Sequence, residues 1–217
     1  MTDPRTPTRI LDAAERLFAE RGFARTTIKA IGTEAGVNSA LLYYYFTDKE
    51  RLYRNVLQRL MDTLIERTSS RLQAGGTPEG RVLALVQAQA EVLAANPNFP
   101  RLMVRELAES DAGHAGEQIR HLAATTFTRL CTLVRDGQAS GAFRKEIDPR
   151  FAAISIVSQV AYFFVAKPAV RILLASSPGG PSPAIVIAYA RHAANFALAA
   201  LAAPSRSRSS RRPRRIP

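Results

Sequence analysis

Residues 26–46 are TTIKAIGTEAGVNSALLYYYF, and they carry the strongest information in the chain about both architecture and role. The segment predicts a helix that begins at Thr26 or Thr27, a turn containing glycine, and a second helix capped by Asn38 or Ser39. Three consecutive tyrosines lie on the second helix. Because successive helical residues are about 100° apart, three adjacent rings cannot all face one core. At least one tyrosine ring therefore faces outward.

The tyrosine helix has a predictable orientation. Leu42 and Phe46 are four residues apart, so they are expected to mark its buried stripe. Ala40 and Tyr44 then lie about 160° and about 200° from Leu42 around the helix. The residues expected at the edges of the exposed face are Leu41 and Tyr43. This exposed face is small and phenolic, and it can enter a groove.

The flanking segments predict two more helices. Residues 8–21 carry Ile10, Ala14, Leu17 and Phe18 as a helical apolar stripe that stops at Gly22. Downstream, the TDKE sequence at 47–50 has the pattern of a capping box, with Thr47 as the cap. The helix that follows is predicted to cover residues 48–72. At 1.5 Å per residue it would be a rod of about 37 Å, long enough to link two domains.

The rest of the chain also has a helical pattern. Ala74-Gly75-Gly76-Thr77-Pro78 is the clearest internal break, and Asp148 followed by Pro149 predicts a firm helix start. Predicted helices cover residues 79–95, 98–110, 115–138, 149–166, 168–175 and 184–203. No run has convincing period-two alternation, so the fold class is predicted to be all-α. The chain is predicted to divide into an N-terminal unit over 1–50, a helical unit over 73–203, and a disordered tail over 204–217.

Composition indicates a globular chain. The 217 residues are 47% apolar and 22% charged, enough to bury a sizeable core. The single Cys131 excludes an intramolecular disulfide framework and, with no signal-peptide pattern at the N-terminus, favours the cytoplasm. That thiol is either a small core residue or a redox sensor. Residues 151–166 and 184–203 are apolar but interrupted by polar side chains, so no membrane span is predicted.

The net charge of +12 is unevenly distributed: residues 1–70 carry +2, residues 71–148 carry 0 and residues 149–217 carry +10. Six of these late charges belong to the Ser/Pro/Arg segment 204–217. One interpretation is a solvated, disordered tail, and the other is an arm that contacts phosphates or other polyanions. A nonspecific nucleic-acid or polyanion-binding protein that acts through this tail is therefore the alternative function.

The tri-helical unit 8–46 has the spacing of a helix-turn-helix, in which the second helix enters the major groove of DNA. Small side chains, and side chains that can touch a thymine methyl, suit contacts with bases. Hydroxyls and a cation suit contacts with phosphates. A helical hairpin that simply packs its aromatics is the plain alternative. The candidate DNA-binding residues are Thr27, Asn38, Ser39, Ala40, Leu41, Tyr43, Tyr44, Tyr45 and Lys49.

Residues 8–60 closely resemble the TetR family of bacterial one-component transcriptional regulators. The matching pieces are Ala14-x-x-Leu17-Phe18 with Gly22-Phe23, Thr26-Thr27-Ile28, Ala35-Gly36-Val37, Leu42-Tyr43-Tyr44-x-Phe46, and Lys49-Glu50-x-Leu52. By this resemblance Thr27, Tyr43 and Lys49 match backbone-contacting positions, and the other candidates match positions that vary with the operator or support contact. Gly32 stands where the family usually has alanine, Leu41 where it has a small polar residue, and Tyr45 where it has histidine.

The resemblance also implies the function, with DNA binding by residues 1–50 and effector binding and dimerisation by residues 73–203. It predicts a homodimeric regulator, most often a repressor, that binds a pseudo-palindromic double-stranded operator and is released by a small-molecule effector in a bacterial cytoplasm, associated with the nucleoid when bound. Helices 149–166 and 184–203 would pair with their symmetry mates, or 149–166 would be intramolecular core. The candidate effector-binding residues, each of which could instead be plain core or surface, are Phe99, Met103, Arg105, Phe127, Cys131, Tyr162 and Phe163. Such a pocket would favour an apolar or aromatic effector.

Patterns typical of enzymes do not occur in the sequence. It has no phosphate-binding glycine loop, no His-Glu-x-x-His and no Cys-x-x-Cys, and His114, His121 and His192 lack metal-ligand spacing. We therefore predict no catalytic residues, no metal and no cofactor.

Overall fold

A computed structural model describes residues 3–109, 113–175 and 181–203. The predicted all-α class is confirmed, since within these ranges the structure is helical apart from one isolated bridge between Phe143 and Ala202. The predicted tail, residues 204–217, lies outside the described residues. The helices are α1 Thr6–Arg25, α2 Ile28–Ala35, α3 Ser39–Tyr45, α4 Lys49–Gln73, α5 Pro78–Ala95, α6 Asn98–Glu109, α7 Gly116–Leu122, the π-helix η1 Ala123–Phe127, α8 Thr128–Ala139, α9 Pro149–Val165, α10 Lys167–Leu173 and α11 Pro183–Leu201.

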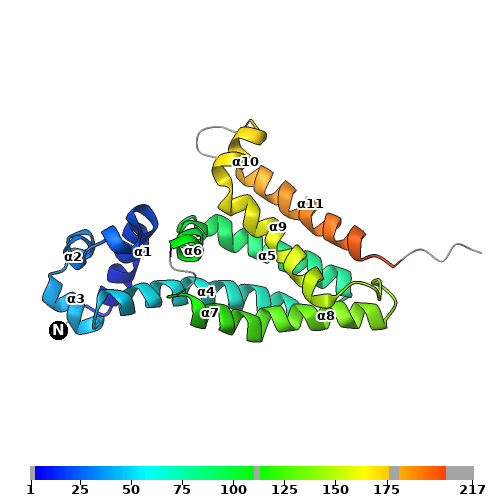
Figure 1. Ribbon diagram of the computed structural model, residues 1–217, viewed down its shortest axis with the longest axis horizontal. Helices are drawn as coiled ribbons and strands as arrows, with labels where there is room; N and C mark the ends of the chain where they lie inside the picture. The colour runs from blue at the N-terminus through cyan, green and yellow to red at the C-terminus, as the bar shows by residue number, and fades with distance from the viewer. Residues whose placement is uncertain (1–2, 110–112, 176–180, 204–217) are drawn as a thin grey trace, which may run out of the picture.

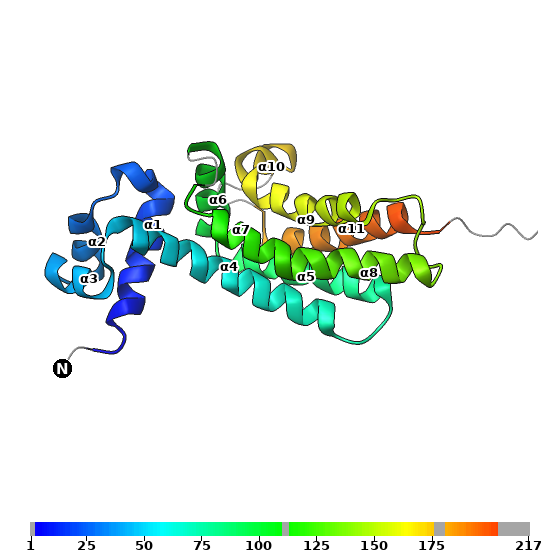
Figure 2. The same ribbon diagram turned by 60° about the horizontal axis from the view of Figure 1, so that its bottom comes forward.

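The helices form a small head and a larger bundle, both joined to α4 (Figure 1). Helices α1 to α3 cluster around the beginning of α4, which then runs on into the bundle formed with α5 and α7 to α11. Seen from the second direction, α4, α5 and α8 still run alongside one another, and α11 ends far from α3 (Figure 2). The last described residues therefore lie at the opposite end of the molecule from the tyrosine helix.

Local sequence signals fix most helix starts. Asp148 caps α9 with Pro149 in the first turn, as predicted, and hydrogen bonds from Arg150 lower the pKa of Asp148 to about 2. The cap predicted for α4 was wrong by one residue. Asp48, and not Thr47, is the N-cap, because its carboxylate accepts a 2.6 Å hydrogen bond from the backbone N–H of Arg51. Glu50 pairs instead with Arg54, one turn further along, at 3.2 Å.

The single helix predicted over 115–138 is also corrected. Its middle is the π-helix η1, in which the backbone N–H of Thr128 bonds to the carbonyl of Ala123 five residues earlier. The wider turn accompanies a buried contact, because the hydroxyl of Thr126 lies 3.0 Å from the hydroxyl of Ser69 on α4. Such π segments often occur at functional sites, and apolar periodicity alone does not predict them.

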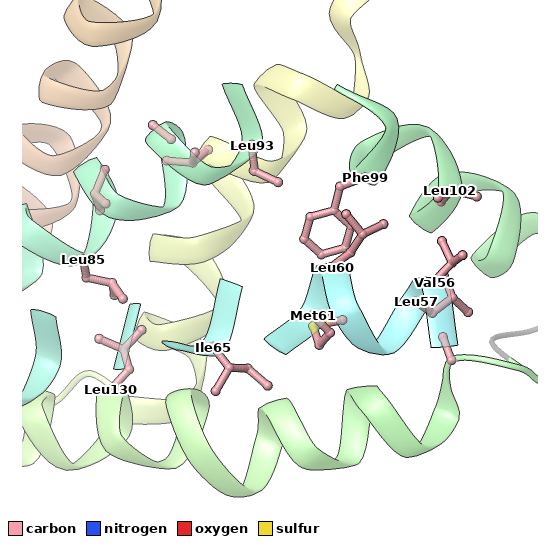
Figure 3. Packing of buried hydrophobic residues seen from close by; sticks show 14 of the residues in the cluster. Val56, Leu57, Leu60, Met61, Ile65, Leu85, Leu93, Phe99, Leu102 and Leu130 are labelled. Carbon is pink, nitrogen blue, oxygen red and sulfur yellow. The ribbon is translucent and has the colours of Figure 1, made fainter. Parts of the chain in front are cut away.

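The core is continuous from the head into the bundle. Helix α4 contributes buried side chains from Leu52 to Leu72, and these pack against α1 at its beginning and against α5, α7 and α8 further along. Phe99 of α6 points toward Leu60 of α4 in the shared core (Figure 3), while α6 itself packs along α1 and α9. A displacement of α6 would therefore disturb the packing of the head, chiefly through α1.

Gly137 gives a stability prediction. The ring of Phe143 packs directly on this glycine of α8, and a Cβ there would overlap the ring. Phe143 is 2% exposed, and its backbone N–H donates to the Gly137 carbonyl at 2.9 Å, so it has little room to move. We expect Gly137→Ala to lower the free energy of unfolding by about 1–3 kcal/mol, as overpacking typically does. Chemical unfolding followed by circular dichroism measures this change.

The matched control is Gly80→Ala in α5. A Cβ at Gly80 would meet only the Thr77 hydroxyl, at an ordinary 3.4 Å. Alanine also has the better helix propensity, by up to about 1 kcal/mol. The control should therefore be neutral or slightly stabilising. Equal effects of the two substitutions would contradict the packing of Phe143 on Gly137.

Candidate nucleic-acid interface and effector cavity

Two caps and one glycine define α2, α3 and the turn between them. The Thr27 hydroxyl accepts from the Ala30 N–H at 3.2 Å, and the Asn38 side-chain oxygen accepts from the Leu41 N–H at 2.8 Å. Both caps are among the predicted alternatives. Gly36 adopts the left-handed conformation with φ 65°, which glycine takes up without strain. The cap occupies the Asn38 oxygen, so this atom is already engaged before any DNA contact.

Gly32 shows why alanine is absent from this position. Its carbonyl accepts from the Val37 N–H at 2.8 Å, and a Cβ on Gly32 would lie 2.9 Å from the Val37 carbonyl oxygen. That distance is too short for a carbon–oxygen contact. The glycine therefore allows α2 to lie close to the turn that leads into α3. In exchange, α2 has a lower helix propensity at this position than it would have with alanine.

The tyrosine helix has the orientation expected from its sequence. Leu42 and Phe46 are 0% and 5% exposed, whereas Tyr43 and Tyr44 are 52% and 76% exposed. Tyr45 is half-buried against the core, and its ring meets that of Tyr44 edge-on with centroids 5.1 Å apart. The remaining candidates also surround this surface: Thr27, Asn38 and Ala40 are exposed, and Ser39 and Leu41 are half-buried. Contact of these residues with DNA stays a prediction.

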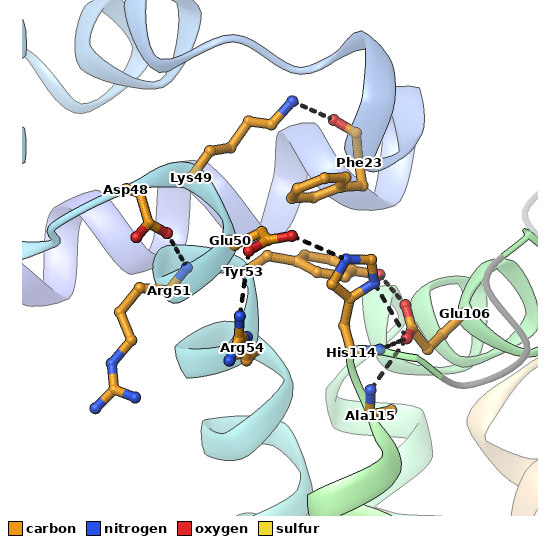
Figure 4. A network of polar contacts seen from close by, with 10 residues as sticks. All are labelled: Phe23, Asp48, Lys49, Glu50, Arg51, Tyr53, Arg54, Glu106, His114 and Ala115. Atoms are coloured by element: carbon orange, nitrogen blue, oxygen red, sulfur yellow. Dashed lines mark hydrogen bonds and ion pairs between the residues drawn. The ribbon is translucent and has the colours of Figure 1, made fainter.

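Lys49 takes part in a local contact that sequence reasoning missed. Its ammonium donates to the carbonyls of Phe23 and Thr26 at 3.1 and 3.2 Å and lies 4.3 Å from the centre of the Phe23 ring (Figure 4). An ammonium has three donors, and two are engaged here. Lys49 therefore ties the start of α4 to the corner between α1 and α2. Its predicted phosphate contact would use the remaining donor or displace these bonds.

A buried carboxylate joins the head to the bundle. Glu106 on α6 is 2% exposed, and it accepts from the Tyr53 hydroxyl at 3.1 Å and from the backbone N–H groups of His114 and Ala115 at 2.6 and 3.0 Å (Figure 4). The His114 ring packs against Phe23 and Tyr53, with centroid distances of 4.8 and 5.3 Å. Elements α1, α4, α6 and the segment before α7 thus meet at one point. The sequence carries no local signal for this cluster, because its members are distant along the chain.

A second polar link joins the same elements. Arg59 on α4 forms ion pairs with Asp12 and Glu15 of α1 at 2.7 and 2.6 Å. Glu15 in turn accepts from the side-chain amide of Asn98, the first residue of α6, at 3.1 Å. Helix α6 therefore contacts both helices that set the orientation of α3.

A cavity of about 300 Å³ lies inside the bundle, with walls from α4 to α9. Three predicted effector-binding residues line it: Phe99, Met103 and Phe127. Its other walls are apolar except for Thr68, Gln89 and Thr126. Leu107 of α6 is part of the wall and 59% exposed, so this side of the cavity reaches the surface.

The other four predicted effector residues lie elsewhere. Arg105 and Phe163 line a separate groove of about 1280 Å³ between α1, α5, α6 and α9 to α11, which shares only Leu93, Pro100 and Val165 with the cavity. Tyr162 is 64% exposed and Cys131 is 4% exposed, and neither lines the cavity or the groove. Burial raises the pKa of the Cys131 thiol, which favours the core interpretation over a redox sensor. Bulk and chain position alone did not indicate which side of each helix faces the cavity.

Helices α9 and α11 each have one buried and one exposed apolar face. On α9, Ala153, Ile156 and Val160 are buried, so the intramolecular interpretation holds for this face. Pairing through the other face is still untested. The large exposed apolar residues of α9 and α11 are Phe151, Ile154, Tyr162, Val165, Ile187 and Phe196.

Helix α11 is also long and apolar enough to cross a membrane, with a mean hydropathy of 1.4 over 18 of its residues. The helix packs against α5 and α9 through its alanine-rich face. Its exposed side carries Arg191, His192 and Asn195 beside the large apolar side chains. Charged and amide groups facing lipid are costly, so this mixed surface fits a protein interface better than a bilayer.

Two protein-family models match this chain, one in its N-terminal part and one in its C-terminal part. Residues 10–56 match the family model described as "Bacterial regulatory proteins, tetR family", and residues 78–182 match "Tetracyclin repressor-like, C-terminal domain". The HTH-type transcriptional repressor NicS of Pseudomonas putida is 29% identical over 74% of this chain and 76% of its own length. The HTH-type transcriptional repressor KstR2 of Rhodococcus jostii is 30% identical over 67% of this chain and 71% of its own.

Among solved structures, the regulator FadR from Bacillus subtilis in complex with stearoyl-CoA has the same fold. Its TM-score is 0.71 at 19% identity, and the match covers 89% of this chain and 98% of that one.

Proposed function

This chain belongs to the TetR family of ligand-responsive transcriptional repressors, and on that premise we propose that it acts as a homodimer on a pseudo-palindromic operator. In this proposal residues 1–50 bind DNA, helix 48–72 connects them to the bundle, and residues 73–203 bind the effector and dimerise. It acts in the cytoplasm, on the nucleoid when bound. The observation that carries the proposal is the surface of α3, where Tyr43 and Tyr44 project away from the buried Leu42.

The DNA contacts follow from that surface. Ala40 leaves room for α3 to approach the base edges, and Leu41 can touch a thymine methyl. The hydroxyls of Tyr43, Tyr44 and Thr27 suit phosphate oxygens. Ser39 and Asn38 lie at the N-terminus of α3, which faces the groove in this geometry. Tyr45 supports Tyr44 from the core side.

The effector site we propose is the bundle cavity. Its almost entirely apolar walls favour an apolar or aromatic molecule. The acyl chain of the stearoyl-CoA bound by the Bacillus subtilis protein is of the same chemical character. Phe99 and Met103 form part of the wall from α6, and the same helix contacts α1 through Asn98 and α4 through Glu106. A ligand that enlarges the cavity would therefore shift α6 and reorient α4.

Such a shift weakens DNA binding only if the ligand binds the released geometry more tightly than the DNA-bound one. Allosteric couplings are typically about 1–3 kcal/mol, which here would change operator affinity by about 5- to 150-fold. We expect two links from α6 to transmit this coupling. One is the bond between Glu106 and Tyr53, and the other runs from Asn98 to Glu15 and on to Arg59.

Selection of bound fragments from a pool of genomic DNA tests the proposal. The full chain should enrich fragments that share one inverted repeat, and the chain truncated after Ala203 should keep its preference for that repeat over competitor DNA. We expect truncation to change the salt dependence at most, because the arginines of 204–217 can add only a sequence-independent attraction. A full chain that enriches no shared repeat, and that loses its DNA binding with the tail, would favour the nonspecific polyanion binder instead.

A further inference from the structure

Gln89 stands out among the residues that line the bundle cavity. It lies in the middle of α5, is 7% exposed, and is flanked by apolar residues of the same helix. Its side-chain nitrogen donates to the carbonyl of Val157 on α9 at 3.0 Å. Its side-chain oxygen is buried and has no hydrogen-bond partner.

The Val157 carbonyl fixes which end of the amide is the acceptor. Turning the amide by 180° would place the Gln89 oxygen against another carbonyl oxygen, which cannot donate a hydrogen bond. The unpartnered atom is therefore an acceptor held in one orientation. Leaving a buried acceptor without a donor destabilises the folded chain, and a ligand donor would remove this cost.

The other polar side chains that line the cavity are already engaged. The Thr68 hydroxyl donates to the Leu64 carbonyl at 2.6 Å, and the Thr126 hydroxyl lies 3.0 Å from that of Ser69. The Gln89 oxygen is shielded from water in the unliganded chain, so a donor reaches it only when a ligand enlarges the cavity, as proposed above. An apolar molecule with its own donor suits such a site.

We propose that the effector is an uncharged, largely apolar molecule with a hydroxyl or N–H group that donates to Gln89, which makes Gln89 a specificity-determining residue. The inference rests on the proposed function in taking the bundle cavity as the effector site. The residues that line the cavity include no acidic side chain to balance a cation. A carboxylate would place its own oxygens against the Gln89 oxygen. The uncharged donor is thus the chemical class that fits the cavity.

Two probes that differ in this donor test the inference. Isothermal titration calorimetry of the full chain would compare 4-hexylphenol with 4-hexylanisole, which lacks the donor. The phenol keeps its proton at neutral pH, because the pKa of a phenol is about 10. We expect the phenol to bind about 10-fold tighter or more, since one satisfied buried hydrogen bond is worth about that factor. In Gln89→Leu the phenol should lose this advantage while the anisole binds as before.

The control variant is Gln87→Leu, the same substitution at an exposed glutamine of α5 that does not line the cavity, and it should keep the preference for the phenol. Unchanged anisole binding shows that Gln89→Leu retains a folded cavity, and Gln89→Met serves if the leucine variant fails to fold. Equal binding of both probes by the wild type, or a preference that survives in the Gln89 variants, would overturn the role of Gln89 and leave the cavity proposal standing. Failure of both probes to bind the wild type would overturn the cavity proposal as well.

Discussion

Replacing Tyr43 and Tyr44 together with alanine is expected to lower operator affinity by about 100-fold or more, because each lost contact with a base or phosphate is worth about 1–3 kcal/mol. Both rings are exposed, and neither closes the core that Leu42 and Phe46 form with the rest of the head. The free energy of unfolding should therefore change by no more than about 0.5 kcal/mol. Gel-shift titration and thermal unfolding measure the two quantities.

The matched control truncates two equally prominent side chains elsewhere. Ile172 and Leu173 on α10 are 73% and 80% exposed, and α10 lies away from α3 (Figure 1). Their double alanine variant should bind the operator as the wild type does. Tyrosine-to-phenylalanine versions of the first variant separate the hydroxyls from the rings. Wild-type affinity in the double tyrosine variant would show that DNA is bound by another surface.

Introducing glutamate at Ile154 and Ile187 should convert the dimer to monomers. These side chains are 52% and 63% exposed in the single chain, on the two helices that we propose pair across the dimer axis. An unpaired charge buried in such an interface costs several kcal/mol. The monomer then presents one α3 instead of two, and losing the second site should weaken operator binding by about 100-fold or more. Sedimentation equilibrium and gel-shift titration follow the two effects.

The control for this variant places the same two charges at Ile172 and Leu173. It adds equal negative charge on α10 but leaves α9 and α11 unchanged. The control should stay dimeric and bind the operator. A dimer that survives glutamates at Ile154 and Ile187 would contradict the proposed interface.

The head was predictable because its signals are local. The caps at Thr27 and Asn38 and the direction of Leu42 relative to Tyr44 depend only on neighbouring residues and helical spacing. The family resemblance covered the same residues, and the comparisons extend it to the bundle.

The bundle was harder to predict because its details depend on contacts between distant segments. The π-helix accompanies the contact between Thr126 and Ser69, which lie 57 residues apart. Phe127 lines the cavity, whereas Tyr162 does not, because similar apolar helices face the cavity on one side and solvent on the other. Gln89 was missed altogether, since a lone amide in an apolar helix has no sequence pattern that distinguishes it from a surface residue.

Footprinting of a selected operator fragment by hydroxyl radicals tests the account of how α3 binds DNA. The account predicts two protected half-sites related by an inverted repeat, with centres about 34–36 Å or a multiple of that apart along one face of the duplex. The Tyr43 and Tyr44 double alanine variant should lose both half-sites together. A single continuous protected stretch without repeat symmetry, or protection that persists in this variant, would contradict the account.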